Sequence, residues 1–330
     1  MSAVPFRFVL VRGPLVIASG RPAFTLIELV VVVAILAVLM MLLLPAIQRV
    51  RAAADAVRCG SNLRQLGIAL HAFHHDHHVF PASGWTQPGP GNPAGRFVGW
   101  RALILPYVEQ DNIRSRYTLT RHWWEEPNLT LAGTPVKIYL CPAAPERPAL
   151  SSAVAKPPRP ALVFPVPPAA ADYEAVMGVQ PCVDAVRYGS PAVNRSVMFR
   201  NSRVAIEHIR DGASNTIMVV ECSGRPFVYR GRTARPDLTN DQGQCWADGE
   251  GAFSLDGASA NGSQQCLGPV LTPRGINATN ENEPYSFHTN GANFLFADGH
   301  IQFIRESVTL PVLAGLITRN GGEIISPDEF

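Results

Sequence analysis

The architecture of this chain is decided by Phe24-Thr-Leu-Ile-Glu-Leu-Val-Val-Val-Val-Ala-Ile-Leu-Ala-Val-Leu-Met-Met-Leu-Leu-Leu44, a run of 21 residues in which Glu28 is the one ionisable side chain. About 20 apolar residues in a helix cross the hydrocarbon core of a bilayer, so the run is long enough for a single span. The apolar part of a secretory signal peptide is usually about 7–15 residues long and precedes a cleavage site. Here Pro45-Ala-Ile-Gln-Arg-Val-Arg51 follows instead. The sequence therefore predicts a retained transmembrane helix over residues 24–44.

The composition of the chain excludes two other classes of protein. Of its 330 residues, 47% are hydrophobic and 16% are charged, which excludes global disorder. The net charge is +2, and the 28 basic residues are spread along the chain rather than gathered in a patch. We therefore expect no nucleic-acid partner.

The segment around the start of the span carries a recognisable motif. Arg21-Pro-Ala-Phe-Thr-Leu-Ile-Glu28 resembles the processing site of type IV prepilins and type II secretion pseudopilins. The resemblance implies that a prepilin peptidase cuts between Ala23 and Phe24 and methylates the new amino group, so that residues 1–23 are a leader. The family strongly prefers Gly where this chain has Ala23.

The same resemblance assigns roles to two residues of the helix. It implies that Glu28 serves subunit assembly and that Pro45 kinks the helix, because proline removes one helix hydrogen bond. A carboxylate is costly in lipid, and pairing with the methylated amino terminus of a neighbouring subunit would offset that cost. The alternative is that Glu28 lies close enough to the membrane surface to reach water. The implied partners are the prepilin peptidase, other pilin or pseudopilin subunits and the lipid bilayer.

The helix is predicted to continue beyond the membrane as a stalk extension over residues 45–80. Apolar residues recur there at three- and four-residue steps, with Gly60-Ser61-Asn62 as a predicted hinge and Pro81 as the end. The expected fold is α+β and pilin-like, with a β-rich head over residues 81–330. The arginines flanking the span do not decide its orientation, whereas the resemblance implies a single-pass protein of the inner membrane with its head on the periplasmic or outer side.

A second resemblance covers most of the chain after the span and identifies it as a member of the DUF1559 family, whose molecular function is not established. Six blocks carry the resemblance: Cys59–His74 with Phe80-Pro81, Trp100–Gln110, Cys141-Pro142, Ile209–Glu221, Thr318–Glu323, and His288 followed after nine residues by Asp298-Gly299.

The last of these motifs indicates a β-hairpin over residues 288–304. Phe294 and Phe296 alternate with other residues at the period of a strand, and Asp298-Gly299 suits a two-residue type I′ turn. His288 is interpreted as capping or bonding the first strand of this hairpin rather than as a catalytic or ligand residue.

Two further segments are predicted to lack regular structure. Nine of the 28 residues in 141–168 are proline, which indicates a loop or stiff connection between a front part and a back part of the head. Residues 239–268 are rich in Gly, Asn, Asp, Gln and Ser and are predicted to form a long loop.

Six cysteines suit an exported head with disulfides. We favour a Cys59–Cys141 pair, because both residues lie in family blocks, and a Cys245–Cys266 pair that closes the polar loop. A zinc site is the alternative, but no Cys-x-x-Cys occurs, so no metal is expected. Residues 71–78 contain several histidines with a spacing that suits metal ligands on one helical face, and we interpret them as a polar helix end.

Two functions remain open. The first is a pseudopilin-like assembly subunit of a type II secretion or type IV pilus-like system. The alternative is a surface or periplasmic receptor for a glycan or a protein, which uses the prepilin signal only for export and anchoring. An enzyme is not expected, because the sequence contains no nucleophile elbow, zinc-protease motif or phosphate-binding glycine loop. No cofactor is expected either.

Overall fold

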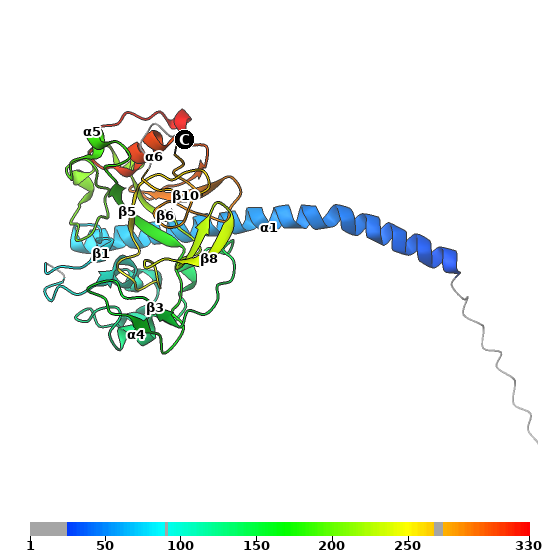
Figure 1. The fold of residues 1–330 in the computed structure, drawn as a ribbon, viewed down its shortest axis with the longest axis horizontal. Helices are drawn as coiled ribbons and strands as arrows, with labels where there is room; N and C mark the ends of the chain where they lie inside the picture. Colours follow the sequence, from blue (N-terminus) through cyan, green and yellow to red (C-terminus); the bar gives the residue numbers. More distant parts are fainter. Residues whose placement is uncertain (1–24, 90–91, 267–272) are drawn as a thin grey trace, which may run out of the picture. The chain divides into compact units, whose positions relative to one another are not determined.

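The computed structural model describes residues 25–89, 92–266 and 273–330 of the chain. The fold is α+β: a long apolar N-terminal helix precedes a globular head with mixed sheets (Figure 1). The chain divides into two compact units, 1–50 and 51–330. The second unit therefore begins within the predicted stalk extension rather than at residue 81.

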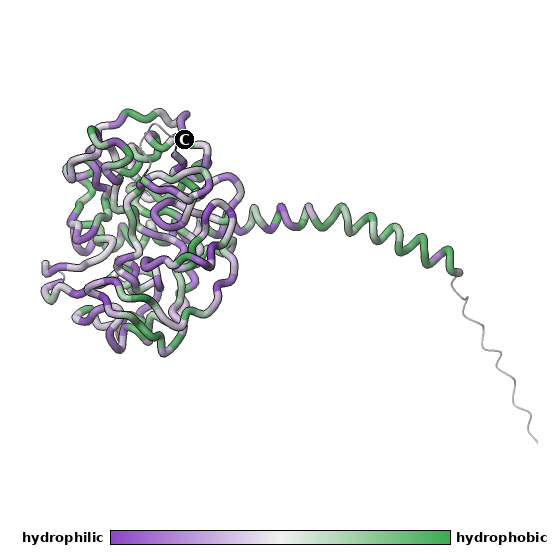
Figure 2. Tube along the Cα trace, viewed as in Figure 1, coloured by the Kyte–Doolittle hydropathy of each residue, from purple (hydrophilic) through white to green (hydrophobic). Residues whose placement is uncertain are grey.

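The N-terminal helix α1 covers Leu26–His77. Among the described residues it is the one helix that is long and apolar enough to cross a membrane, which fits a single-pass anchor. Its first part is an almost continuous hydrophobic segment in Figure 2, and its apolar side chains are exposed. The helix continues through Pro45, so the kink at that residue stays a prediction.

The C-terminal part of α1 belongs to the core of the head. Cys59, Leu63, Leu66 and Leu70 are fully buried and follow one another at steps of four, three and four residues. The hinge predicted at residues 60–62 is wrong, because these residues are helical. Cys59 is the first residue of this buried stripe, so the helical spacing of buried residues continues without interruption across residues 60–62.

The main sheet of the head has five strands in the order β11-β10-β6-β5-β9. All neighbours are antiparallel except β5 and β9, which are parallel. The strands are β5 (Tyr173–Val179), β6 (Ile217–Glu221), β9 (Phe253–Leu255), β10 (Gly291–Phe296) and β11 (Ile301–Arg305).

Both faces of this sheet are buried. Ala292, Phe294 and Phe296 of β10 lie in one hydrophobic core, whereas Leu295 and the following Ala297 lie in the other. The period of two along a strand places alternate side chains on opposite faces. The buried stripe of α1 shares the core of Leu295, and α6 (Leu310–Ile317) lies in the core of the phenylalanines.

Short elements surround the sheet. The remaining helices are α2 (Trp100–Leu103), α3 (Asp111–Arg114), α4 (Asn128–Leu131) and α5 (Ala185–Tyr188), with 3₁₀ turns at Leu105–Val108, Lys137–Tyr139, Ile206–His208, Ala213–Asn215 and Pro327–Glu329. Three two-stranded sheets pair β1 (Gly84–Trp85) with β2 (Val98–Gly99), β3 (Ser152–Ala153) with β4 (Leu162–Val163), and β7 (Phe227–Arg230) with β8 (Thr233–Thr239).

The two segments predicted to lack regular structure both contain strands. The proline-rich segment 141–168 includes the short pair β3 and β4, because its prolines leave residues 152–153 and 162–163 free to pair. It does not separate two halves of the head, since Trp100 and Trp246 lie in the same core. The segment 239–268 contains β9 and several buried side chains, so its polar composition did not make it an exposed loop.

The hairpin of β10 and β11 is confirmed, but its turn differs from the prediction. Leu295 pairs with Ile301, and Gly299 has a φ of 92° whereas Asp298 is not among the residues with positive φ. A type I′ turn needs positive φ at both central residues, so that prediction is wrong. The Asp298 carboxylate accepts the His300 N–H at 3.0 Å, which suits a three-residue loop that ends in Gly299.

The disulfides agree with one predicted pair and contradict the other. Cys59 is bonded to Cys141, and their Cα atoms are 5.3 Å apart. Cys266 is bonded to Cys182 instead of Cys245, whose thiol is free and buried. The Cys245–Cys266 prediction is therefore wrong, because Cys245 packs into the core that contains Trp246 while the chain brings Cys182 next to Cys266.

Candidate functional site

The residues of the processing motif lie at the start of the described chain. Ala23 and Phe24 lie outside the described residues. Glu28 accepts hydrogen bonds from the Thr25 N–H at 2.8 Å and from the Thr25 hydroxyl at 2.9 Å. The Glu28 N–H donates back to the Thr25 hydroxyl at 3.3 Å. Thr25 and Glu28 thus form a capping box at the beginning of α1, a role that the Thr-x-x-Glu spacing could have predicted.

Four buried side chains meet in the head. They are Cys59 on α1, Cys141 after the 3₁₀ turn at 137–139, Glu221 at the end of β6, and His288 before β10, and their donor atoms lie within 4.8 Å of one another. Each comes from a different one of the blocks found in the sequence. We call these four residues the buried cluster.

The contacts within the buried cluster are close. His288 Nε2 lies 3.1 Å from Glu221 Oε1 and 3.4 Å from the Cys141 sulfur. The Cys141 sulfur lies 3.8 Å from Glu221 Oε1. Glu221 and Cys59 have no solvent exposure, and His288 is 5% exposed. A carboxylate and an imidazole therefore face the Cys59–Cys141 bond in a dry environment.

Neighbouring groups hold the buried cluster in place. Because β10 pairs with β6 in register, Asn293 lies beside Glu221, and its backbone N–H donates to Glu221 Oε2 at 2.7 Å. The Asn293 amide also donates to Glu221 Oε1 at 3.2 Å. The Cys141 N–H donates to the Asp172 carboxylate at 2.9 Å.

The sequence predicted only part of this arrangement. The sequence assigns His288 to the first strand of its own hairpin, but its imidazole lies 3.1 Å from Glu221 at the end of β6, a residue that the sequence does not indicate as part of a site. Asp298 and Gly299 belong to the hairpin turn and not to the buried cluster. The signal for Glu221 was its place at the polar end of an apolar strand, where a carboxylate needs a partner.

A second group of buried polar side chains accounts for the first residues of the Trp100–Gln110 block. The Glu174 carboxylate accepts the Trp100 indole N–H and an Arg101 guanidinium N–H, both at 3.0 Å. Arg101 also donates to the Tyr173 carbonyl at 2.7 Å. Arg101 and Glu174 are almost fully buried, so this group holds α2 against β5.

The histidines at the end of α1 make separate contacts. His74 Nε2 accepts the Ile206 N–H at 3.2 Å, while His77 Nδ1 lies 3.0 Å from the Phe73 carbonyl. Burial, together with the charge of His71, lowers the pKa of His74. His78 has a φ of 57° and follows the last helical residue. These contacts favour the interpretation that the histidines of residues 71–78 form a polar helix end rather than a set of metal ligands.

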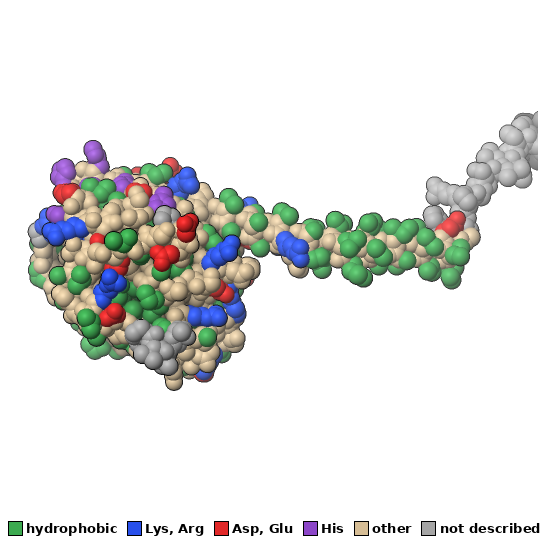
Figure 3. Space-filling view, turned by 90° about the horizontal axis from the view of Figure 1, so that it is seen from above, with side chains coloured by type: hydrophobic (Ala, Val, Ile, Leu, Met, Phe, Trp, Pro, Cys, Tyr) green, Lys and Arg blue, Asp and Glu red, His purple; other side chains and the backbone are tan. Residues whose placement is uncertain are grey.

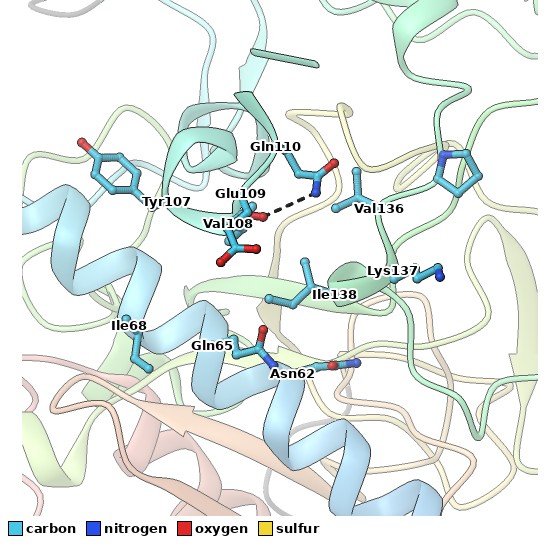
Figure 4. A pocket seen from close by; sticks show the side chains of 11 residues that line it. Asn62, Gln65, Ile68, Tyr107, Val108, Glu109, Gln110, Val136, Lys137 and Ile138 are labelled. Atoms are coloured by element: carbon cyan, nitrogen blue, oxygen red, sulfur yellow. Dashed lines mark hydrogen bonds between the residues drawn. The ribbon is translucent and has the colours of Figure 1, made fainter. Parts of the chain in front are cut away.

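The head also has a surface pocket of about 650 Å³ along α1 (Figure 4). The side chains of Asn62 and Gln65 reach it from α1, Glu109 reaches it from the opposite side, and Ile138 contributes apolar surface. The Asn62 amide donates to the Leu140 carbonyl at 2.9 Å. The lining mixes polar and apolar side chains, and the volume lies within the range of small-ligand pockets.

Comparison with known proteins identifies the two parts of the chain. The model of the prokaryotic N-terminal methylation motif matches residues 19–44. This motif indicates an exported protein of the type IV pilin or pseudopilin kind, and it implies processing by a prepilin peptidase and assembly with pilin-type subunits. No curated protein and no solved structure matches the chain. A model described as a protein of unknown function, DUF1559, matches residues 48–310, so the chain belongs to the DUF1559 family.

Proposed function

We propose that this protein is a non-enzymatic, membrane-anchored pseudopilin-like subunit of a type II secretion or type IV pilus-like system, with its helix in the inner membrane and its head on the periplasmic or outer side. The methylation motif over residues 19–44 carries the proposal, because it coincides with the start of an exposed apolar helix. Glu28 stands in the first turn of that helix, where it would meet the amino terminus of a neighbouring subunit.

Processing is tested by mass spectrometry of the mature amino terminus. We expect an N-methylated Phe24, with residues 1–23 absent. An intact Met1, or cleavage beyond Leu44, would contradict the proposal.

Assembly is tested by two variants that separate the two roles of Glu28. Glu28→Gln keeps a side chain that can complete the capping box but removes the charge, whereas Thr25→Ala removes the cap and keeps the charge. We expect in-membrane crosslinking between subunits to be lost in Glu28→Gln and retained in Thr25→Ala. If Glu28→Gln assembles like the wild type, the assembly role fails and only the anchor remains.

The pocket along α1 supports a second candidate, a receptor for a glycan. Two of its side chains, Gln65 and Gln110, are amides that can donate and accept hydrogen bonds with hydroxyl groups, while the Asn62 amide already donates to the Leu140 carbonyl and the Tyr173 hydroxyl. We expect titration calorimetry with soluble oligosaccharides to show binding that Gln65→Ala weakens at least tenfold. Val186→Ser is the control, because Val186 is 98% exposed and lies outside the pocket. Equal binding by both variants would remove this candidate.

A further inference from the structure

The buried cluster contains the donor types that zinc selects. Two cysteine sulfurs, one imidazole nitrogen and one carboxylate oxygen converge there from four segments of the chain. Structural zinc sites use four such ligands in a tetrahedron. A search for Cys-x-x-Cys cannot find this set, because Cys59 and Cys141 are 82 residues apart.

The separations within the buried cluster suit a tetrahedral ion. Bonds of about 2.0–2.3 Å to zinc place neighbouring donor atoms about 3.3–3.8 Å apart. His288 Nε2 lies 3.1 Å from Glu221 Oε1 and 3.4 Å from the Cys141 sulfur, and that sulfur lies 3.8 Å from Glu221 Oε1. All four donor atoms lie within 4.8 Å of one another, so binding an ion requires the two bonded sulfurs to separate and the other pairs to adjust by about 1 Å or less.

A purely structural disulfide does not account for its neighbours. A disulfide sulfur is a weak hydrogen-bond acceptor and needs neither an imidazole nor a carboxylate beside it. Burying an ion pair is often no better for stability than packing apolar side chains of similar volume. Glu221 and His288 are nevertheless buried against Cys141, and Asn293 orients Glu221 through two N–H donors. Ligand carboxylates of metal sites are commonly held in this way.

We propose that Cys59, Cys141, Glu221 and His288 bind one zinc ion when the two cysteines are reduced, and that the disulfide is the oxidised, metal-free form of the same site. On binding, the two thiols release their protons and Zn²⁺ bonds both thiolates. On oxidation, hydrogen peroxide takes two electrons from the two thiolates and two protons from the buffer, so that its O–O bond breaks while the S–S bond forms. The products are the disulfide, free Zn²⁺ and two molecules of water.

The first test measures zinc in the wild-type protein. Full-length protein in detergent is reduced under anaerobic conditions, mixed with zinc, and separated from free metal by gel filtration. We expect about one zinc per chain in the reduced protein and less than a tenth of that in the oxidised protein. Reduced, folded protein that holds no zinc would overturn the proposal.

Variants assign the metal to the buried cluster. We expect His288→Ala and Cys59→Ser to lose the zinc. The double variant Cys182→Ser/Cys266→Ser removes the other disulfide, and His74→Ala/His78→Ala removes two histidines at the end of α1, so both controls are expected to keep the zinc. Zinc that is lost with either control pair, and kept in His288→Ala, would show that the metal lies elsewhere.

A spectroscopic measurement does not depend on the folding of any variant. Co²⁺ in place of zinc in the reduced wild type should give the intense visible bands of a tetrahedral ion and a thiolate-to-cobalt charge-transfer band. Two equivalents of hydrogen peroxide should abolish both bands and release the ion to a chromogenic chelator. An octahedral spectrum without charge transfer would contradict thiolate ligation.

Discussion

Individual buried residues set how the stability of the head depends on pH. Glu283 has no solvent exposure, and it faces Asp256, which is 5% exposed. Burial, and then the neighbouring Asp256, raises the pKa of Glu283 well above its usual range. Burial also raises the pKa of Asp256. Two carboxyl groups in one dry site cannot both ionise easily, so Glu283 keeps its proton in the folded protein.

This protonation predicts that the contribution of Glu283 to the stability of the wild type falls as the pH rises from about 4.5 to 7.5. Above the pKa of the unfolded state, Glu283 is ionised in the unfolded chain but protonated in the folded one, so the unfolded state binds fewer protons and the free energy of unfolding falls. Glu283→Gln removes this contribution. We expect urea unfolding to show a gain in stability of Glu283→Gln over the wild type at pH 7.5 that shrinks at pH 4.5.

The control for this prediction is Glu146→Gln, because Glu146 is exposed. Its stability should follow that of the wild type at both pH values. A constant difference between Glu283→Gln and the wild type across the range would mean that Glu283 titrates normally.

At the scale of elements, α1 shows how one helix meets two different environments. Its first part is exposed and apolar, while its last turns pack into the head; Figure 3 shows apolar side chains along the former and charged groups scattered over the head. Two glycines on the helix differ in their surroundings. A Cβ on Gly67 would lie 2.9 Å from Leu295 Cδ1, whereas on Gly60 its nearest neighbour would be 4.0 Å away.

We therefore expect a larger side chain to stabilise the head at position 60 and to destabilise it at position 67. Gly60→Ala should stabilise the head by about 0.5–1 kcal/mol, because alanine favours a helix and meets no clash. Gly67→Val should cost about 1–3 kcal/mol, because it overpacks the contact between α1 and β10. Thermal unfolding followed by circular dichroism checks both, and a Gly67→Val protein as stable as the wild type would contradict the close packing.

At the scale of the whole molecule, the boundary between the two compact units decides what can fold alone. The unit 51–330 contains both hydrophobic cores and both disulfides. Cys59, Leu63 and Leu66 of α1 are among its fully buried residues. The end of α1 is thus part of the head rather than a support for it.

Two truncations test this boundary. A chain of residues 51–330 should be soluble and unfold cooperatively. A chain of residues 67–330 loses three buried side chains, at about 1.5–3 kcal/mol for each large one, and one disulfide, at about 2–4 kcal/mol. Because domains are stable by only about 5–15 kcal/mol, we expect the shorter chain to be unfolded or aggregated in circular dichroism and size-exclusion chromatography. Equal cooperativity of the two chains would show that α1 is dispensable to the head.

Much of the molecule could be predicted from its sequence, and three of the predictions that are wrong share a cause. The polar segment 239–268 was expected to be a loop, yet β9 pairs there in parallel with β5. Cys266 was expected to bond Cys245, its nearest cysteine in the sequence, yet it bonds Cys182, 84 residues away. The sequence does not indicate Glu221 as a site residue, because its partner His288 lies 67 residues further along the chain. Each of these three errors concerns a contact between distant segments, whereas the type I′ turn at Asp298-Gly299 and the hinge at residues 60–62 are errors of local backbone conformation.

The sequence by itself determined the long apolar N-terminal helix, its processing motif, the family and the place of the β10–β11 hairpin, because each depends on residue types at short, regular spacing. Only the tertiary structure decided that α1 enters the core, that Cys182 pairs with Cys266, and that Cys59, Cys141, Glu221 and His288 meet. The periodicity of a helix or strand is set by neighbouring residues. A contact such as that between Cys141 and His288, 147 residues apart, depends on the path of the whole chain between them.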